Sequence, residues 1–183
     1  MSSSAFIRKN FRRTTLASVV ALGAFGASNS FAADATATAT GTVIEPIAIT
    51  KVVDLNFGQF APGSAGGTVT VATNGDRTAS GPILSSTGAS AAAAQFDVTG
   101  AADATYSIAW SGDTELTDGA TNTMTLGRIS ELTPSASTTV GDVTSGTLTS
   151  GAQSIYLGGE LTVATAQAAG TYTGNVTVTV EYN

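Results

Sequence analysis

The amino-acid sequence predicts an all-β fold, a sandwich or a barrel. The first observation behind this prediction is a series of short segments in which every second residue is apolar, separated by turns rich in glycine, proline and asparagine. The second is the end of the chain, where apolar and polar residues alternate up to the last residue. Successive strand side chains point to opposite faces, so a period of two gives each segment one apolar and one wetted face.

The first segment is predicted to be a cleaved secretory signal peptide, residues 1–32. It opens with four basic residues: Arg8, Lys9, Arg12 and Arg13. A short apolar run follows at Leu16–Ala27, and a small-x-small pattern ends at Ala32. This order of features is typical of signal peptides. We therefore expect an exported protein, located in the periplasm, at the cell surface or outside the cell.

Removal of this peptide leaves a strongly acidic chain. Lys51, Arg77 and Arg128 then stand against thirteen acidic residues, a net charge of about −10. Nucleic acids and anionic membranes bind clustered lysine and arginine, so we expect neither as a partner. No second hydrophobic span follows the signal peptide, so we expect no membrane span in the mature chain. The chain has no cysteine, so no disulfide can stabilise it. Roughly 150 residues nevertheless suffice for one domain with its own core.

The mature chain is predicted to begin with an N-terminal extension, residues 33–43, ahead of a single domain, residues 44–183. After Asp34 the extension alternates alanine or glycine with threonine. This pattern is compatible with a strand. Alanine buries little area, however, so we expect a low independent stability.

Three strand regions are predicted in the first half of the domain. Residues 43–60 carry a strong apolar pattern, which Pro46 interrupts in a way that favours an edge strand or a bend. Residues 68–72 alternate, and Asn74-Gly75 after them is a strong hairpin signal. Residues 95–99 form the third region, with alternate residues apolar.

Three more regions follow before the C-terminal stretch. Residues 105–111 place three large apolar side chains on one face, and residues 122–132 contain Gly127, which predicts a bulge or a kink. Residues 154–165 carry Gly158-Gly159 in the middle of their apolar pattern.

The last strand is predicted over residues 170–183. One parity carries the larger apolar and aromatic side chains, and threonine dominates the other. A strand that ends on the final residue needs a pairing partner and a cover for its apolar face. Since no helix is predicted, that cover must come from a sheet.

The chain lacks the residues of several catalytic mechanisms. It has no histidine and no cysteine, which excludes a Ser-His-Asp triad, a thiol nucleophile and a zinc site of the usual kind. We therefore expect no enzyme and no cofactor, and we assign no catalytic, cofactor-binding or metal-ligating residue.

Two groups of residues allow other interpretations. Asp113, Glu115 and Asp118 cluster in a predicted loop. A solvated acidic turn is the favoured interpretation, and calcium binding is the alternative, because hard oxygen ligands are present without the spacing of a calcium loop. Tyr106 and Trp110 suit sugar stacking, but their strand spacing favours a place in the core.

Three segments carry a family resemblance: Leu55-Asn56-Phe57-Gly58, residues 66–71 and residues 170–183. Together they resemble a bacterial secreted domain-of-unknown-function family, DUF4402, which is itself similar to the spore-coat-U and archaic chaperone–usher fimbrial subunits. The resemblance covers about residues 44–183. It implies an immunoglobulin-like, pilin-like antiparallel β-sandwich and a role as a fimbria-like subunit.

The resemblance also implies which residues pair with partners. In pilins a periplasmic chaperone holds the C-terminal strand, and a donated N-terminal extension completes the neighbouring subunit. The corresponding chaperone- or strand-pairing residues here are Tyr172, Val176, Val178, Val180 and Tyr182. The corresponding donor is residues 33–43, which carry alanine where pilins have bulky anchors. Our hypothesis is that this extension pairs within its own subunit or with the next one.

The leading functional hypothesis is an exported structural subunit, fimbria-like or of the surface or matrix, with adhesion as a further role. It would assemble by strand addition, with copies of itself and a periplasmic chaperone as partners. The alternative is a secreted carbohydrate- or calcium-binding β-sandwich module. A second alternative is a small outer-membrane β-barrel, although such barrels need strands of about 9–11 residues and aromatic girdles.

Overall fold

The computed structural model describes residues 32–183. Apart from Ala32, the predicted signal peptide lies outside these residues. The compact part is Thr42–Asn183, called the domain below. No helix is present among the described residues, and residues 32–47 contain no strand. The strands are β1 (Ala48–Val53), β2 (Phe60–Ala61), β3 (Gly67–Val71), β4 (Arg77–Ser80), β5 (Ile83–Leu84), β6 (Ala94–Thr99), β7 (Thr105–Gly112), β8 (Glu115–Thr117), β9 (Thr123–Glu131), β10 (Ser145–Thr147), β11 (Ala152–Val163) and β12 (Val176–Tyr182).

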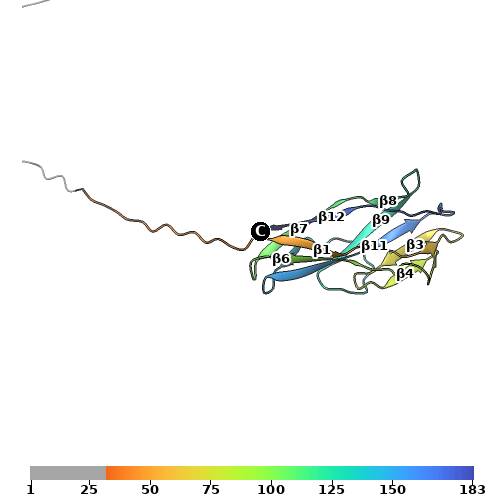
Figure 1. Cartoon of the computed structure of the whole chain (residues 1–183), viewed down its shortest axis with the longest axis horizontal. Helices are drawn as coiled ribbons and strands as arrows, with labels where there is room; N and C mark the ends of the chain where they lie inside the picture. The colour runs from red at the N-terminus through yellow and green to blue at the C-terminus, as the bar shows by residue number, and fades with distance from the viewer. Residues whose placement is uncertain (1–31) are drawn as a thin grey trace, which may run out of the picture. The chain divides into compact units, whose positions relative to one another are not determined.

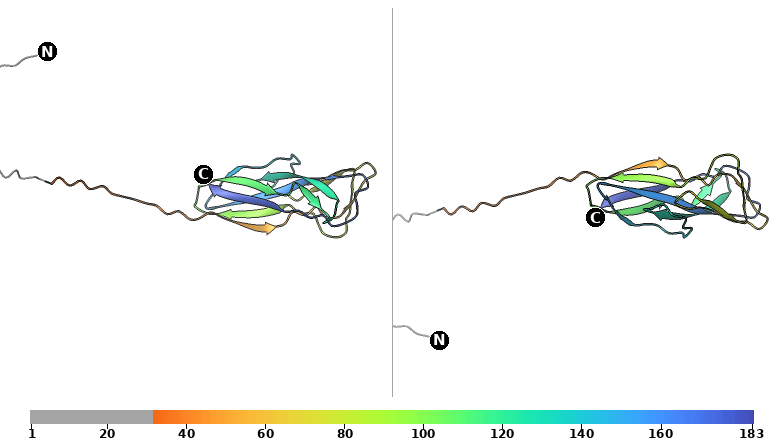
Figure 2. Two further views of the ribbon diagram at one scale, coloured as in Figure 1. Left: turned by 90° about the horizontal axis from the view of Figure 1, so that it is seen from above. Right: turned by 90° about the horizontal axis from the view of Figure 1, so that it is seen from below.

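The domain is an antiparallel β-sandwich, which confirms the predicted fold class (Figures 1 and 2). The larger sheet has the order β1-β6-β11-β3-β4, and β9 pairs with β11 and carries β8. The smaller sheet has the order β10-β7-β12. The short strands β2 and β5 pair with each other. The chain's last strand therefore lies at one edge of the smaller sheet.

The central strand of the larger sheet is β11. On one side its first half pairs with β6 and its second half with β3, while β9 pairs along its other side. Gly158 lies where the neighbour changes from β6 to β3. A Cβ atom there would overlap the carbonyl oxygen of Val71. The Gly158-Gly159 pair therefore marks a close approach of two backbones, a usual reason for glycine inside a strand.

The core consists of two clusters that share β11. The first cluster lies between the two sheets and contains Ala94, Phe96, Val98, Tyr106, Ile108, Leu148, Ile155 and Leu157. The second contains Phe57, Val69, Val71, Met124, Leu126, Leu161 and Val163. Leu55 and Val176 pack against both clusters. Alternate residues of the strands supply most of these side chains, as their period of two predicts.

The Asn74-Gly75 hairpin is confirmed. It joins β3 to β4, and Gly75 has a φ of 89°, a conformation that glycine adopts without strain. The backbone N–H of Ala72 donates to the carbonyl of Asp76 at 2.9 Å, which closes the turn.

One sequence-based expectation about strand shape was wrong. The predicted bulge at Gly127 is absent, because β9 and β11 pair in unbroken register from Leu126 to Glu131. The register shift is in β1 instead, between Lys51 and Val53. Gly127 makes room for the side chain of Val140, since a Cβ there would lie 3.0 Å from Val140 Cγ2.

Two strand boundaries also differ from expectation. The last strand begins at Val176, not at residue 170, because the preceding residues form only an isolated bridge between Thr173 and Thr117. The acidic loop is interrupted by β8, which pairs with the start of β9. The start of β12 depends on long-range pairing with β7, whereas β8 forms through a local hairpin with β9 that the pattern of residues did not reveal.

Candidate strand-pairing edge

The strand β12 carries four of the five predicted pairing residues. Val176, Val178, Val180 and Tyr182 lie in it, whereas Tyr172 lies before it. Tyr172 packs against the second core cluster, and its hydroxyl donates to the carbonyl of Ala168 at 2.9 Å. Tyr172 therefore supports the loop before β12 rather than the edge of the strand.

Two hydrogen bonds at the ends of β12 establish which way its backbone groups point. The N–H of Asp113 donates to the carbonyl of Asn175 at 2.7 Å, and the N–H of Asn183 donates to the carbonyl of Thr105 at 3.2 Å. Hydrogen-bonded and non-hydrogen-bonded pairs alternate in an antiparallel ladder. The odd-numbered residues of β12 therefore bond to β7, and the even-numbered residues direct their N–H and C=O groups to the other side.

That other side of β12 is a free strand edge. Among the described residues, β12 pairs with β7 alone. We call the outward backbone groups of Val176, Val178, Val180 and Tyr182 the β12 edge. A row of unpaired N–H and C=O groups on a regular strand is a template for pairing with another strand. The same four residues thus direct their side chains inward and their backbone groups outward.

The inward side chains of β12 are half-buried against their own chain. All four pack on the first core cluster, as do Ile47 and Ile49 from β1 and the residues leading into it. The cluster beneath is closed, since Val98, Tyr106 and Ile155 have no exposed surface. Side chains of the same chain therefore cover most of the apolar face of β12, whereas no described strand pairs with its backbone edge.

The opposite side of the sandwich is closed by the chain itself. The N–H of Gly141 donates to the carbonyl of Arg128 on β9 at 2.8 Å, and the N–H of Ile108 on β7 donates to the carbonyl of Thr144 at 2.8 Å. Residues 141–144 thus pass from one sheet to the other. An ion pair between Arg128 and Asp142, with an N···O distance of 2.8 Å, holds this segment in place.

On the side of the sandwich that carries the β12 edge, the larger sheet ends in the strand β1, which contacts β12. Of the six large apolar residues that are exposed in the described chain, four lie in β1 or in the residues before it: Val43, Ile44, Val52 and Val53. The register shift at Val52 and the preceding Pro46 make β1 an irregular template. The longer and regular β12 is the better acceptor.

The hydroxyl of Tyr182 joins the end of β12 to the start of the domain. It accepts a hydrogen bond from the N–H of Ala101 at 2.7 Å and donates one to the carbonyl of Glu45 at 2.7 Å. Gly100 leaves the space for this hydroxyl, which a Cβ would fill. Tyr182 therefore fixes the position of Glu45, where the extension joins the domain. No sequence pattern predicts this contact, because both partners of the hydroxyl are backbone groups.

Replacing Tyr182 by phenylalanine is expected to lower the free energy of unfolding by about 1–2 kcal/mol, because two backbone groups lose their partner. The matched control is Tyr106→Phe. Tyr106 is fully buried and its hydroxyl has no hydrogen-bond partner, so its removal should be neutral or stabilising. Urea denaturation of both variants measures the difference, and equal destabilisation by the two would contradict it.

The acidic residues of the predicted loop are not brought together. Asp118 accepts hydrogen bonds from the N–H of Ala120 at 2.9 Å and the side chain of Asn122 at 2.6 Å. The bond from the Asn122 side chain holds the pKa of Asp118 below its usual value. Asp113 instead accepts the N–H of Asn175 at 2.7 Å. Within residues 32–183, no group of three or more acidic residues is placed to hold a metal ion.

The aromatic pair proposed for sugar stacking is part of the core. Tyr106 is fully buried, and burial raises its pKa. Trp110 is half-buried, donates its indole N–H to the carbonyl of Val143 at 3.0 Å and meets Phe96 edge to face. The favoured core interpretation of the sequence is thus the one that these contacts support.

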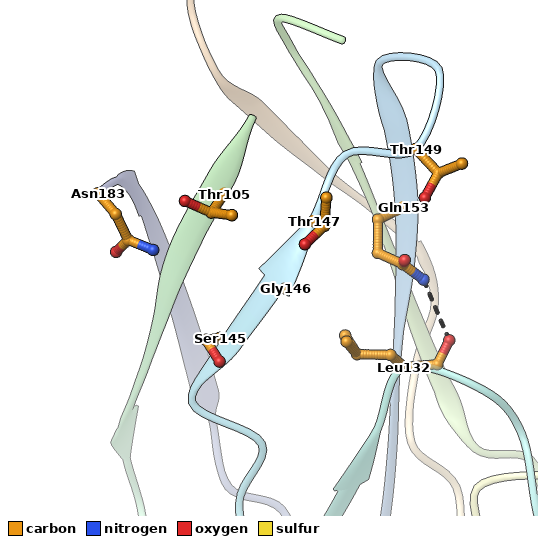
Figure 3. A pocket seen from close by; sticks show the side chains of 8 residues that line it. All are labelled: Thr105, Leu132, Ser145, Gly146, Thr147, Thr149, Gln153 and Asn183. Carbon is orange, nitrogen blue, oxygen red and sulfur yellow. Dashed lines mark hydrogen bonds between the residues drawn. The ribbon is translucent and has the colours of Figure 1, made fainter. Parts of the chain in front are cut away.

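A hollow of about 460 Å³ lies beside β10 (Figure 3). Its lining is neutral, and consists of Thr105, Leu132, Ser145, Gly146, Thr147, Thr149, Gln153 and Asn183. The Gln153 amide is already engaged with the carbonyl of Leu132 at 3.1 Å. Hydroxyl and amide groups without a charged residue form no acid–base pair here.

The fold defines a β-sandwich domain whose last strand has one unpaired edge within residues 32–183. The chain belongs to the family described as a domain of unknown function, DUF4402, which matches residues 47–182. This confirms the family suggested by the sequence, and the match spans β1 to β12. A comparison with curated proteins found no match. Within the described part of the chain, no helix is long and apolar enough to cross a membrane.

Proposed function

We propose that this protein is an exported structural subunit of the cell surface or extracellular matrix, fimbria-like in its assembly and adhesive in its role. Neighbouring copies associate by adding a strand to the β12 edge. The observation that supports this proposal most directly is that edge. Seven residues pair in regular register on one side, and no strand of the described residues lies on the other. A periplasmic chaperone would use the same edge before assembly.

Two further observations support association on this side of the sandwich. The other side is closed by residues 141–144, whereas the exposed apolar residues gather at β1 and before it. The chain is also acidic, and β12 carries Glu181 as its only charged residue. Two copies that repel each other elsewhere meet least repulsion at such an edge.

Replacing Val178 by proline is expected to leave the domain folded and to abolish assembly. The N–H of Val178 points to the free edge, where proline is tolerated, but its loss removes a donor that an added strand needs. Light scattering and electron microscopy of residues 33–183 measure assembly. The unchanged chain should form species larger than a monomer, and the Val178→Pro variant should stay monomeric.

The matched control for this experiment is Val178→Ala, which removes the same side chain but retains the N–H. It should assemble like the unchanged chain, because main-chain bonds supply the affinity in strand addition. A monomeric unchanged chain at every concentration, or normal assembly of the proline variant, would contradict the proposal.

A further inference from the structure

Asn74 and Gly75, in the turn of the β3–β4 hairpin, form a dipeptide that can react with itself. The backbone nitrogen after an asparagine can attack the side-chain carbonyl carbon of that asparagine, and glycine hinders this attack least because it has no side chain. Asn74 is exposed to water, and it is the only asparagine of the chain that glycine follows. The exposed Asn175 is followed by the β-branched Val176, which obstructs the same attack.

The reaction balances with water as its only co-reactant. The backbone N–H of Gly75 gives up its proton, and the nitrogen forms a bond to Cγ of Asn74. The bond from Cγ to Nδ2 then breaks, and Nδ2 leaves with a proton as ammonia. Water opens the resulting succinimide ring at either of its carbonyl groups. The product at position 74 is aspartate or isoaspartate, and nothing is oxidised or reduced.

In the folded hairpin both reacting groups are held by hydrogen bonds. The N–H of Gly75 donates to the carbonyl of Ala72 at 2.9 Å. The side-chain oxygen of Asn74 accepts the N–H of Asp76 at 3.0 Å, and its Nδ2 donates to Asp76 Oδ2 at 2.7 Å. The attack requires the Gly75 nitrogen and the Asn74 amide to be released together. Several hydrogen bonds must therefore break before the bond to Cγ can form.

The turn is also anchored to a distant part of the chain. The backbone N–H of Asn74 donates to the carbonyl of Ser135 at 3.0 Å. The neighbouring Thr73 is buried, and its hydroxyl accepts the N–H of Ser135 at 2.9 Å and donates to the carboxylate of Glu131 on β9. The turn cannot open without breaking these contacts. Release of Asn74 therefore accompanies the unfolding of more than the hairpin tip.

We propose that Asn74 is a deamidation site that the folded domain protects, so that its modification marks copies of the chain that have been unfolded. This inference does not depend on the proposed function. The mark persists after refolding, because isoaspartate carries its Cβ atom in the main chain and lengthens the turn. The bond that closes the turn between Ala72 and Asp76 then loses its geometry. A marked copy has an altered hairpin at β4, which is an edge of the larger sheet.

The protection is tested by incubating residues 33–183 at mildly alkaline pH, either in buffer or unfolded in guanidinium chloride. Peptide mapping by mass spectrometry measures the conversion of each asparagine. Deamidation of Asn74 should be at least about tenfold slower in the folded chain, and Asn175 should stay unmodified in both solutions. Equal rates for Asn74 in the two solutions, or no reaction in the unfolded chain, would overturn the inference.

The part played by the hydrogen bonds is tested with Asp76→Ala, which removes the acceptor of Nδ2 but retains the backbone N–H. Deamidation of Asn74 should become about threefold faster or more in the folded variant and stay unchanged in guanidinium chloride. The matched control is Asp54→Ala, which removes an exposed carboxylate far along the chain, before β2. Circular dichroism checks that both variants remain folded during incubation. Equal folded-state rates in the two variants would overturn protection by these bonds.

Discussion

Replacement of Gly158 by valine is expected to lower the free energy of unfolding by about 3 kcal/mol or more, which is enough to unfold much of the protein at room temperature. The Cβ atom would overlap the carbonyl oxygen of Val71 and lie 3.0 Å from the carbonyl carbon of Ala72. Both are backbone atoms of the chain beside the central strand. They cannot move without disrupting the pairing of β11 with β3.

The matched control is Gly141→Val. Gly141 has an ordinary negative φ range, and a Cβ there would meet nothing within 4 Å. Its substitution should change stability by less than about 0.5 kcal/mol, as for most surface positions. Equilibrium urea denaturation followed by circular dichroism compares the two variants. Equal midpoints would show that the backbones at Gly158 are not in close contact.

Replacement of Arg77 by methionine is expected to cost about 3 kcal/mol, since its guanidinium group makes three charge-assisted hydrogen bonds. It donates to the carbonyl oxygens of Phe57 at 2.9 Å, Gln59 at 3.2 Å and Ser85 at 2.8 Å. These bonds join the loop before β2 to the chain after β5. Methionine retains the aliphatic part of the side chain, so the loss measures the guanidinium group.

The control is Arg128→Met, which removes the ion pair with Asp142. Both side chains of this pair are about a quarter exposed, so its loss should cost no more than about 1 kcal/mol. Urea denaturation measures the loss of stability in each variant, and we expect a far larger loss for Arg77→Met than for Arg128→Met. A reversed order would contradict the role of Arg77.

The contacts of Arg77 also explain one part of the family resemblance. Gly58 has a φ of 68°, and a Cβ there would overlap the Arg77 guanidinium and lie 3.1 Å from the carbonyl of Ala89. The Phe57-Gly58 segment therefore combines a core side chain with a glycine over which an arginine passes. The sequence showed the motif, but its physical reason needed the position of a residue nineteen places later.

Much of the fold was predictable because it depends on local patterns. Alternation located β3, β6, β7, β9 and β11 within a few residues, and Asn74-Gly75 located the β3–β4 hairpin. Pro46 indicated an edge strand or a bend, and β1 after it is an edge strand. The strands that were missed, such as β8 and β10, have three residues each, too few for alternation to identify them. β8 pairs with β9 in a hairpin, and β10 pairs with the distant β7.

The candidate strand-pairing edge was likewise predictable only in part. The sequence by itself determined that alternate residues of the last stretch are apolar, and so which side chains of β12 face the core. The tertiary structure alone decided that Tyr172 lies outside that strand, that the apolar face is largely covered, and that the backbone edge pairs with no second strand of residues 32–183. The reason is physical: side chains differ from residue to residue, whereas every non-proline backbone unit carries the same donor and acceptor. Whether those groups are paired depends only on which strands lie beside them.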